Sequence, residues 1–192
     1  MKKYVVGIFG KTGSGKSTVS KILSEKYGFH HIDVDKIGHI VLERMKDKVI
    51  SGFGEKIVTD GKIDRKKLGD IVFKDRNELY KLNRIVHPEI KRETLEEIKK
   101  TNKKYIVIDA ALLFEIGLDE YCDFLIMVES KEDLIYDRNY KDRNWTQEKT
   151  ANILRSQEYL DILRGKADFI IYNNGDEEKL NKQIEFLVHI IF

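Results

Sequence analysis

Five short apolar runs stand out along a chain that is otherwise rich in charged residues. They cover Tyr4–Phe9, His30–Asp33, Tyr105–Asp109, Phe124–Val128 and Phe169–Tyr172. Each run has the length and the β-branched or aromatic content of a buried strand, and segments with helical spacing of apolar residues separate them. Strands that alternate with helices form a parallel sheet covered on both faces. The pattern therefore predicts an α/β fold, a three-layer sandwich with a five-stranded parallel sheet.

Two of the intervals between these strands are longer than a single crossover helix requires. Residues 36–103 show repeated helical spacing, which His87-Pro88 interrupts, and they predict an inserted helical subdomain. Residues 131–167 begin with a helix and predict a second helix whose N-cap is Thr146. We therefore expect a single domain over residues 1–192, with a nucleotide core at about 1–35, 104–130 and 168–192.

Composition restricts the partners that this chain can bind by charge. Its 35 Lys and Arg residues nearly balance 33 Asp and Glu residues, for a net charge of +2. No overall basic field favours nucleic acid or an anionic membrane, and the run 99–104 predicts a solvated loop. The single cysteine, Cys122, excludes an internal disulfide, and no Cys/His cluster has zinc-ligand spacing. No apolar stretch reaches transmembrane length. We expect a cytoplasmic protein without nucleic-acid or membrane partners.

The most specific motif of the chain lies at residues 10–17. They read Gly-Lys-Thr-Gly-Ser-Gly-Lys-Ser, the phosphate-binding pattern G-x-x-x-x-G-K-[ST], between an apolar strand and a helical pattern that ends at Gly28. Glycines permit the backbone angles and the close approach to phosphate that this loop needs. The backbone N–H groups then converge on one spot, where the helix dipole adds positive potential. The motif predicts a nucleotide-binding loop made of Gly13, Ser14, Gly15, Lys16, Ser17 and Thr18.

Acidic residues at the ends of the predicted strands complete the chemistry of phosphoryl transfer. Lys16 can reach the β- and γ-phosphates, and the Ser17 hydroxyl can hold Mg²⁺. Asp109 closes the third strand and is either a second Mg²⁺ ligand, acting through water, or a simple turn residue. Asp33 and Asp35 follow the second strand, where a small-molecule kinase needs a carboxylate to deprotonate the acceptor hydroxyl. Either can instead cap the next helix, a role that fits Asp35 better than Asp33.

The cations of residues 131–167 have two interpretations. Arg138, Lys141, Arg143 and Arg155 alternate with acids, as in a salt-bridged pair of surface helices. They also fit a lid that brings cations onto the γ-phosphate and excludes water. Their place after the fourth strand favours the lid. A guanine-specific switch is disfavoured, because residues 173–176 lack the lysine of the Asn-Lys-x-Asp element.

Several motifs occur in the same order and spacing as in one enzyme family. Beside the phosphate loop they are Ile32–Ile37, Asp60–Arg65 with Leu68 and Phe73, His87–Ile90, Leu112–Glu115, Arg138, Gln157, Ala167-Asp168 and Asn173–Gly175. They span nearly the whole chain, which resembles dephospho-coenzyme A kinase. The resemblance implies transfer of the γ-phosphoryl group of ATP to the ribose 3′-hydroxyl of dephospho-coenzyme A, the last step of coenzyme A synthesis.

The resemblance also implies a role for individual residues. Asp33 would be the general base, Lys16 and Arg138 would stabilise the transferring phosphoryl group, and Ser17 would help to hold Mg²⁺. Asn174 would contact the nucleotide. The acceptor would be bound by Asp35, His87, Leu113, Phe114 and Glu115. Residues 36–103 would then form the acceptor-binding domain and residues 131–167 the lid.

Three positions depart from the family pattern. His39 stands where Arg is usual, Ala110-Ala111 where Val-Pro or Ile-Pro is usual, and Asp142-Arg143 where Arg-Asp is usual. On a helix the last exchange turns the guanidinium by ~100°. Two other functions stay open: a kinase for another small hydroxyl acceptor, such as a nucleoside or nucleoside monophosphate, and a non-catalytic nucleotide-binding module. The absence of a basic stripe with interleaved aromatic residues disfavours a module directed to nucleic acid.

Overall fold

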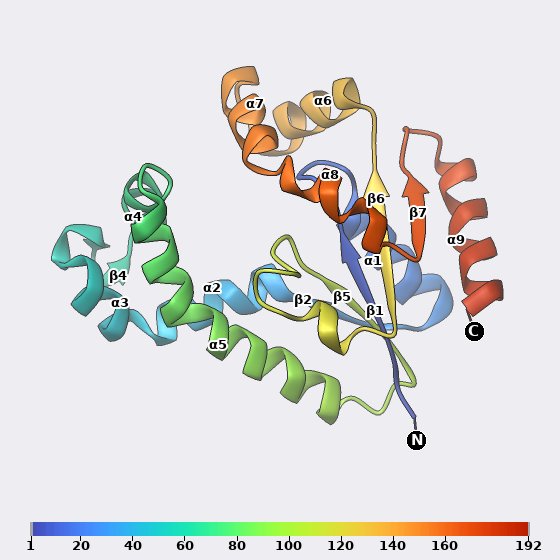
Figure 1. The fold of residues 1–192 in the computed structure, drawn as a ribbon, viewed down its shortest axis with the longest axis horizontal. Helices are drawn as coiled ribbons and strands as arrows, with labels where there is room; N and C mark the ends of the chain where they lie inside the picture. Colours follow the sequence, from blue (N-terminus) through green and yellow to red (C-terminus); the bar gives the residue numbers. More distant parts are fainter. Residues whose placement is uncertain (1, 192) are drawn as a thin grey trace. The chain divides into compact units, whose positions relative to one another are not determined.

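A computed structural model describes residues 2–191 and contains a five-stranded sheet. Its strands are β1 (Tyr4–Phe9), β2 (His30–Asp33), β5 (Tyr105–Asp109), β6 (Phe124–Glu129) and β7 (Phe169–Tyr172), in the order β2-β5-β1-β6-β7 (Figure 1). β1 pairs in parallel with β5 and β6, and β6 pairs in parallel with β7. The five predicted strands and the α/β class with a parallel sheet are confirmed. The phosphate loop follows the carboxyl end of β1, which lies between β5 and β6 in the sheet. Sheets of this kind bind ligands beyond the carboxyl ends of their strands.

The chain divides into two compact units. The first is built from residues up to Ile32 and from Thr101 onward, and the second from Asp33–Lys100. Besides the sheet, the first unit contains α1 (Lys16–Tyr27), α6 (Glu132–Arg143), α7 (Gln147–Ser156), α8 (Tyr159–Leu163) and α9 (Glu177–Ile191), with short 3-10 turns at Asp119–Tyr121 and Arg164–Lys166. This unit carries the phosphate loop, at the start of α1.

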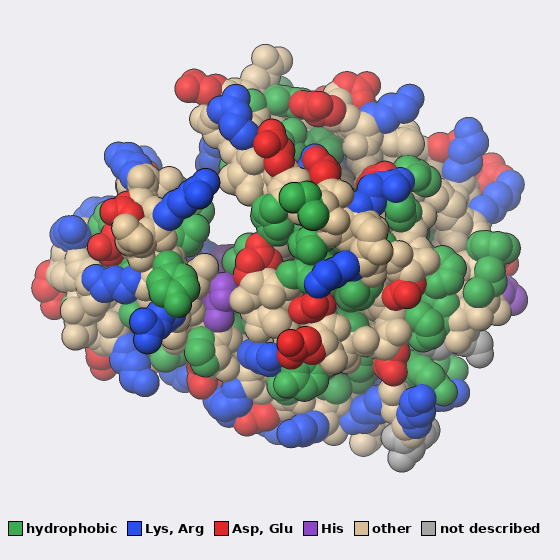
Figure 2. Space-filling view, in the orientation of Figure 1, with side chains coloured by type: hydrophobic (Ala, Val, Ile, Leu, Met, Phe, Trp, Pro, Cys, Tyr) green, Lys and Arg blue, Asp and Glu red, His purple; other side chains and the backbone are tan. Residues whose placement is uncertain are grey.

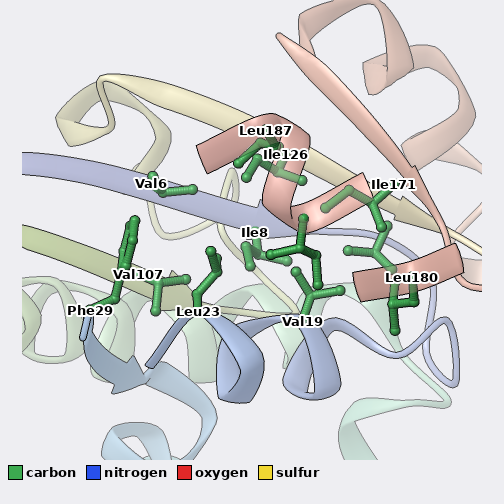
Figure 3. Close-up of a cluster of buried hydrophobic side chains, with 12 residues drawn as sticks. Val6, Ile8, Val19, Leu23, Phe29, Val107, Ile126, Ile171, Leu180 and Leu187 are labelled. Atoms are coloured by element: carbon green, nitrogen blue, oxygen red, sulfur yellow. The ribbon is translucent and has the colours of Figure 1, made fainter. Parts of the chain in front are cut away.

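One face of the sheet is covered by α1 and α9. Val19 and Leu23 of α1 lie one turn apart and face the sheet beside Ile8, while Leu180 and Leu187 of α9 pack next to them (Figure 3). All five side chains are buried. Burial of a side chain of this size stabilises the fold by roughly 1.5–3 kcal/mol. These contacts fix α1 on the sheet, and with it the helix N-terminus that faces the phosphate loop.

The opposite face is covered by the segment that follows β5. A Cβ atom on Gly7 would lie 2.7 Å from the Cys122 sulfur and 3.0 Å from Leu113 Cδ2, so only glycine fits there. Phe114 packs edge-on against Phe9, with 5.0 Å between the ring centroids. This irregular segment therefore fills the position that a crossover helix takes on the other face.

The second unit is helical except for one short hairpin. It contains α2 (Val34–Arg44), α3 (Lys46–Phe53), a 3-10 turn at Glu55–Ile57, β3 (Val58–Thr59), β4 (Lys62–Ile63), α4 (Arg65–Val72) and α5 (Arg76–Lys100). α5 packs against α2, α3 and α4. Arg44 of α2 forms ion pairs with Glu89 and Glu93 of α5, and Arg92 adds a hydrogen bond to Glu89. The unit is thus organised around one long helix.

That long helix corrects two sequence predictions. His87-Pro88 does not interrupt it, and Pro88 lies inside α5. Proline removes one backbone hydrogen bond, but Val86 and Ile90 on either side are buried and hold the helix to its neighbours. The helix also runs to Lys100, so the predicted loop at 99–104 is a helix end followed by a shorter loop.

The β3–β4 hairpin was not predicted, although its turn carries a recognisable signal. Val58 pairs with Ile63 and Thr59 with Lys62 in antiparallel register. The two turn residues, Asp60 and Gly61, have φ angles of +51° and +73°, which suit an Asp-Gly hairpin turn. Asp64, directly after the hairpin, caps α4 by accepting hydrogen bonds from Lys66 and Lys67 N–H.

Charges of both signs are mixed over the surface. Figure 2 shows Lys and Arg side chains interleaved with Asp and Glu on the face in view. This mixture agrees with the near balance of charges in the sequence. Within residues 2–191, no helix is both long enough and apolar enough to cross a membrane.

Candidate active site

Three glycines give the phosphate loop its shape. Gly10, Gly13 and Gly15 have φ angles of +145°, +83° and +97°, which residues with a side chain rarely adopt. A Cβ atom on Gly10 would also lie 2.3 Å from the carbonyl oxygen of Val128. The Ser14 N–H closes a turn by donating to the Lys11 carbonyl at 3.1 Å. The motif therefore folds as the predicted strand, loop and helix.

Lys16 lies folded over this loop. Its ammonium group donates to the Gly10 carbonyl at 3.0 Å and lies 3.4 Å from the Lys11 carbonyl oxygen, and the residue is only 9% exposed. Ser17 and Thr18 are exposed in the first turn of α1. A phosphate oxygen carries negative charge and a carbonyl oxygen does not, so the Lys16 ammonium group is attracted more strongly to phosphate than to these carbonyls.

Asp109 lies at the end of β5, 6% exposed, beside the start of α1. Burial raises the pKa of Asp109, but contacts from His31 and Ser17 and the charge of Lys16 outweigh burial and hold this pKa below its ordinary value. The carboxylate is therefore ionised at neutral pH. His31 Nε2 lies 3.8 Å from Asp109 Oδ2, beyond hydrogen-bond distance, and it makes no hydrogen bond within the described chain.

These donors fit a magnesium ion that is held together with a nucleotide. Ser17 and Asp109 offer a hydroxyl and an ionised carboxylate, the hard oxygen ligands that Mg²⁺ prefers. Among residues 2–191, no cluster of three or more His, Cys, Asp or Glu side chains is able to hold a metal by itself. Mg²⁺ in kinases is bound by one or two protein ligands, with phosphate oxygens and water as the others. The pair therefore suits such a site.

Arg138 of α6 also contacts the phosphate loop. Its Nη1 donates to the carbonyls of Gly13 at 3.1 Å and Ser14 at 3.3 Å, and to the Ser130 hydroxyl at 3.1 Å. Its Nη2 donates to the backbone oxygen of Asn173 at 2.9 Å. The predicted lid arginine thus lies at the loop, bound to backbone carbonyls.

Two residues that contact the loop, and one that supports one of them, were missing from the predicted site. Asn173, directly after β7, donates from Nδ2 to the Ser14 carbonyl at 3.0 Å. Gln157, at the end of α7, accepts from the Thr12 N–H at 2.9 Å and donates to the Thr12 hydroxyl at 3.0 Å. Ser130 donates to the Asn173 carbonyl at 2.7 Å. A polar residue at a strand end followed by a second Asn was the available signal for Asn173, but its partner lies 159 residues away in sequence.

Asn174, the predicted nucleotide contact, supports the start of α6. Its Oδ1 accepts a hydrogen bond from the Lys131 N–H at 3.0 Å, and the residue is exposed. Its contact with nucleotide stays a prediction. Of the two adjacent asparagines, Asn173 is the one that touches the phosphate loop.

Asp33, the predicted base, is the last residue of β2 and the N-cap of α2. Its Oδ1 accepts a hydrogen bond from the Lys36 N–H at 2.9 Å. The prediction that Asp35 is the better cap was wrong, because α2 begins at Val34, earlier than the sequence indicated. Asp33 remains exposed. Asp35 and His87 belong to the second unit, and their part in acceptor binding stays a prediction.

The predicted acceptor segment follows β5 and divides between core and surface. Leu113 is 1% exposed and lies in the core against Gly7, so it supports the segment. Phe114 is half-buried, and the Lys166 ammonium lies 5.1 Å from its ring centroid. Glu115 is exposed. Burial and a hydrogen bond with Glu115 raise the pKa of Tyr159. Because Tyr159 is the first residue of α8, this hydrogen bond links Glu115 to α8.

A pocket of about 520 Å³ lies between the phosphate loop and α6, α7 and α8. Lys11 and Ser130 line it on the loop side, and Tyr136, Leu154 and Arg155 on the helix side. Lys11 also forms an ion pair with Asp161 of α8 at 2.8 Å. The lining mixes cations, acids and apolar groups, as a site for a polar substrate requires.

Lys141 and Arg143, two other cations of residues 131–167, have local partners. Lys141 pairs with Asp137 one turn earlier at 2.7 Å, and the Arg143 guanidinium lies over the Trp145 ring, 4.9 Å from its centroid. Thr146 caps α7 by accepting from the Lys149 N–H, as predicted. Arg138 differs from Lys141 and Arg143, because it reaches the phosphate loop.

Comparisons with known proteins show which family this chain resembles. A family model described as dephospho-CoA kinase matches residues 4–179. The dephospho-CoA kinase of Fusobacterium nucleatum is 39% identical over 188 residues, which cover 96% of this chain and 97% of that protein. The crystal structure of TT1252 from Thermus thermophilus has a TM-score of 0.88 at 26% identity and covers 100% of both chains. Dephospho-CoA kinase from Campylobacter jejuni has a TM-score of 0.71 at 28% identity and covers 98% of this chain and 97% of that one.

These matches run through both units, and they confirm the resemblance that the ordered motifs indicated. The chain belongs to the dephospho-CoA kinase family.

Proposed function

We propose that this protein transfers the γ-phosphoryl group of ATP to the ribose 3′-hydroxyl of dephospho-CoA, giving CoA and ADP. Family membership supports the substrate pair. The observation that carries the chemistry is the phosphate loop with Lys16 and Ser17 beside the ionised Asp109. Such a loop binds the triphosphate and leaves the γ-phosphoryl group to be attacked in line by a hydroxyl oxygen.

Mg²⁺ would be held by Ser17 and Asp109 together with the nucleotide. When bound, the ion neutralises charge on the phosphate oxygens and stabilises the leaving group. Lys16 would stabilise the same negative charge on the phosphate oxygens. Its ammonium group, which now contacts the carbonyls of Gly10 and Lys11, would bind phosphate oxygens in their place. Water is the remaining source of metal ligands.

Asp33 is the proposed general base. It ends β2, the strand next to β5 in the same sheet, so it lies at the carboxyl edge that binds ligands in this fold. One carboxylate oxygen caps α2. A carboxylate has two oxygens, so the second can accept the proton of the ribose hydroxyl as the new O–P bond forms.

Arg138 is the proposed lid cation. Its guanidinium lies at the loop through the carbonyls of Gly13 and Ser14. An arginine has five N–H donors in a planar fork, and it can exchange a carbonyl for a phosphoryl oxygen when nucleotide binds. The pocket lined by Lys11 and Arg155 is proposed to take part of the nucleotide. Phe114 and Glu115, in the segment that follows β5, are proposed acceptor contacts. Asp35 and His87 of the second unit are proposed acceptor contacts as well.

We propose that the protein works in the cytoplasm, because its single cysteine fits a reducing compartment. A lone cysteine cannot form an internal disulfide. Burial raises the pKa of Cys122 to about 12. The thiol therefore stays protonated and is a poor nucleophile for exchange.

A coupled assay of ADP release tests this function. The purified protein is mixed with ATP, Mg²⁺ and one acceptor from a panel that contains dephospho-CoA, nucleosides, nucleoside monophosphates and shikimate. We expect the highest kcat/KM with dephospho-CoA, and a product that carries one added phosphate at the 3′ position by phosphorus NMR. A higher kcat/KM with another acceptor would reassign the substrate, and ATP binding without transfer to any acceptor would indicate a binding module.

A further inference from the structure

The side chain of Asn173 fits over the phosphate loop with its polar groups in use. The residue is 7% exposed. Its Nδ2 donates to the Ser14 carbonyl at 3.0 Å, and its Oδ1 lies 3.3 Å from Arg138 Nη2. Its backbone N–H donates to Glu129 at 2.8 Å. A buried amide with these contacts has one orientation, because exchange of its oxygen and nitrogen would place donor against donor.

The contact with Ser14 orients the next peptide group of the loop. A trans peptide is planar, so its C=O and its N–H point in opposite directions, and the described chain has no cis peptide bonds. When Asn173 and Arg138 draw the Ser14 carbonyl outward, the Gly15 N–H points to the other side. That side is the anion cradle at the start of α1, where N–H groups bind phosphate.

Gly15 and Asn173 are matched to each other in shape. A Cβ atom on Gly15 would lie 1.9 Å from Asn173 Nδ2. The amide therefore occupies the space that a side chain at position 15 would need. The glycine of the motif admits the asparagine, and the asparagine in turn holds the glycine's peptide group.

We propose that Asn173 is a positioning residue for phosphate binding, which acts through the Ser14–Gly15 peptide and does not touch the nucleotide base. This inference rests on one part of the proposed function, the binding of a nucleoside triphosphate by the loop. It predicts a specific signature: loss of Asn173 weakens every ligand that carries a polyphosphate and leaves a ligand without phosphate unaffected.

Binding calorimetry on Asn173→Ala and Asn173→Asp tests the proposal, with tripolyphosphate, ADP and adenosine as probes. Asn173→Ala should weaken tripolyphosphate and ADP by the same factor, roughly 10-fold, since the hydrogen bonds of the buried amide to the Ser14 carbonyl and to Arg138 are lost. Asn173→Asp has the same shape and keeps the acceptor for Arg138, but it lacks the Nδ2 donor and adds a negative charge beside the loop, so its loss should be larger than that of Asn173→Ala. Adenosine affinity should equal that of the wild type in both variants.

Gln183→Ala is the matched control. Gln183 accepts from the Tyr172 N–H at 2.9 Å and donates to its carbonyl at 3.0 Å, so this amide supports the end of β7 without reaching the loop. It should leave tripolyphosphate affinity unchanged. An equal loss in Gln183→Ala would assign the effect to strand support and overturn the proposal.

Two other results would overturn the inference, and a third separates it from the proposed function. A parallel loss of adenosine affinity would make Asn173 a base contact, and unchanged polyphosphate affinity in both Asn173 variants would leave it without a role. Thermal unfolding identifies a variant that does not fold, and the isosteric Asn173→Asp then decides. If these binding results hold while dephospho-CoA is not phosphorylated, the proposed function fails and the inference stands.

Discussion

The phosphate loop and the helices at residues 131–167 both carry cations, yet the side-chain contacts in the two regions differ. Side chains from three distant segments contact the loop backbone: Arg138, Gln157 and Asn173. In the helices, Lys141 and Arg143 instead contact neighbours on the same or the next element. Arg138 of α6, the proposed lid cation, instead donates hydrogen bonds to the loop carbonyls of Gly13 and Ser14. These contacts separate residues that hold the backbone of the phosphate loop from residues that only interact with their neighbours on the surface.

The largest expected effect is that of Lys16→Ala. Lys16 is a buried cation over the loop, so its removal should lower kcat/KM by about 10⁴-fold and weaken ATP binding as well, as for a cation that stabilises a transferring phosphoryl group. Lys21→Ala on the same helix is the control, because Lys21 is exposed and pairs with Glu25 at 3.8 Å. Steady-state kinetics and calorimetry measure both effects. Equal losses in the two variants would remove the special role of the loop lysine.

The second-largest effect is expected for Arg138→Ala, which can be compared with changes at the nearby cations Lys141 and Arg143. We expect kcat to fall by about 10³-fold if Arg138 acts like an arginine finger, and Arg138→Lys to recover only part of that loss, because an ammonium lacks the planar fork. Lys141→Ala should have a small effect, since Lys141 pairs with Asp137 on its own helix. Arg143→Ala should be mild, since its guanidinium lies on Trp145. A larger loss at Arg143 than at Arg138 would mean that the lid register described here is wrong.

Gln157→Ala should have a moderate effect. The side chain makes two hydrogen bonds to Thr12, and their loss frees one end of the loop, so we expect the KM for ATP to rise by about 10-fold with a smaller change in kcat. Asn152→Ala, an exposed position on the same helix, is the control. A fall in kcat at unchanged KM would place Gln157 in the chemical step and contradict this account.

The smallest effect is expected in the second unit, at Glu89. A hydrogen bond and the charge of Arg92, with the charge of Arg44, outweigh partial burial and lower the pKa of Glu89. A lowered pKa in the folded state stabilises the fold at neutral pH, and that stability is lost as pH falls through the lowered pKa. Glu89→Gln should therefore lower Tm by about 2 °C at pH 7, and the difference should vanish in strong acid. A difference that grows in acid would have the opposite sign and refute the assignment.

Features set by local pattern were predictable from the sequence. The five strands and the phosphate loop follow from short apolar runs and from glycine positions, and all of them were confirmed. The Thr146 cap follows from one residue and its neighbours in the same way. Such elements depend on residues that are close in sequence.

Features set by distant contacts or by competing local signals were not predictable in the same way. α5 continues through Pro88 because neighbouring helices hold it. Asp33 caps α2 because that helix starts at Val34, a boundary that shifts easily by a residue or two. Asn173 meets Ser14 across 159 residues. The Asp60-Gly61 hairpin is a different failure, since its local signal was present and went unused.

We propose that phosphoryl transfer to a hydroxyl acceptor needs both the phosphate loop and the Asp33 carboxylate. Asp33→Asn tests it most directly, because it removes the proton acceptor and keeps a side-chain oxygen for the Lys36 N–H. We predict that kcat with dephospho-CoA falls by about 10²–10⁴-fold while the dissociation constant of a non-hydrolysable ATP analogue stays within about twofold of the wild type. Turnover close to that of the wild type in Asp33→Asn would contradict the account.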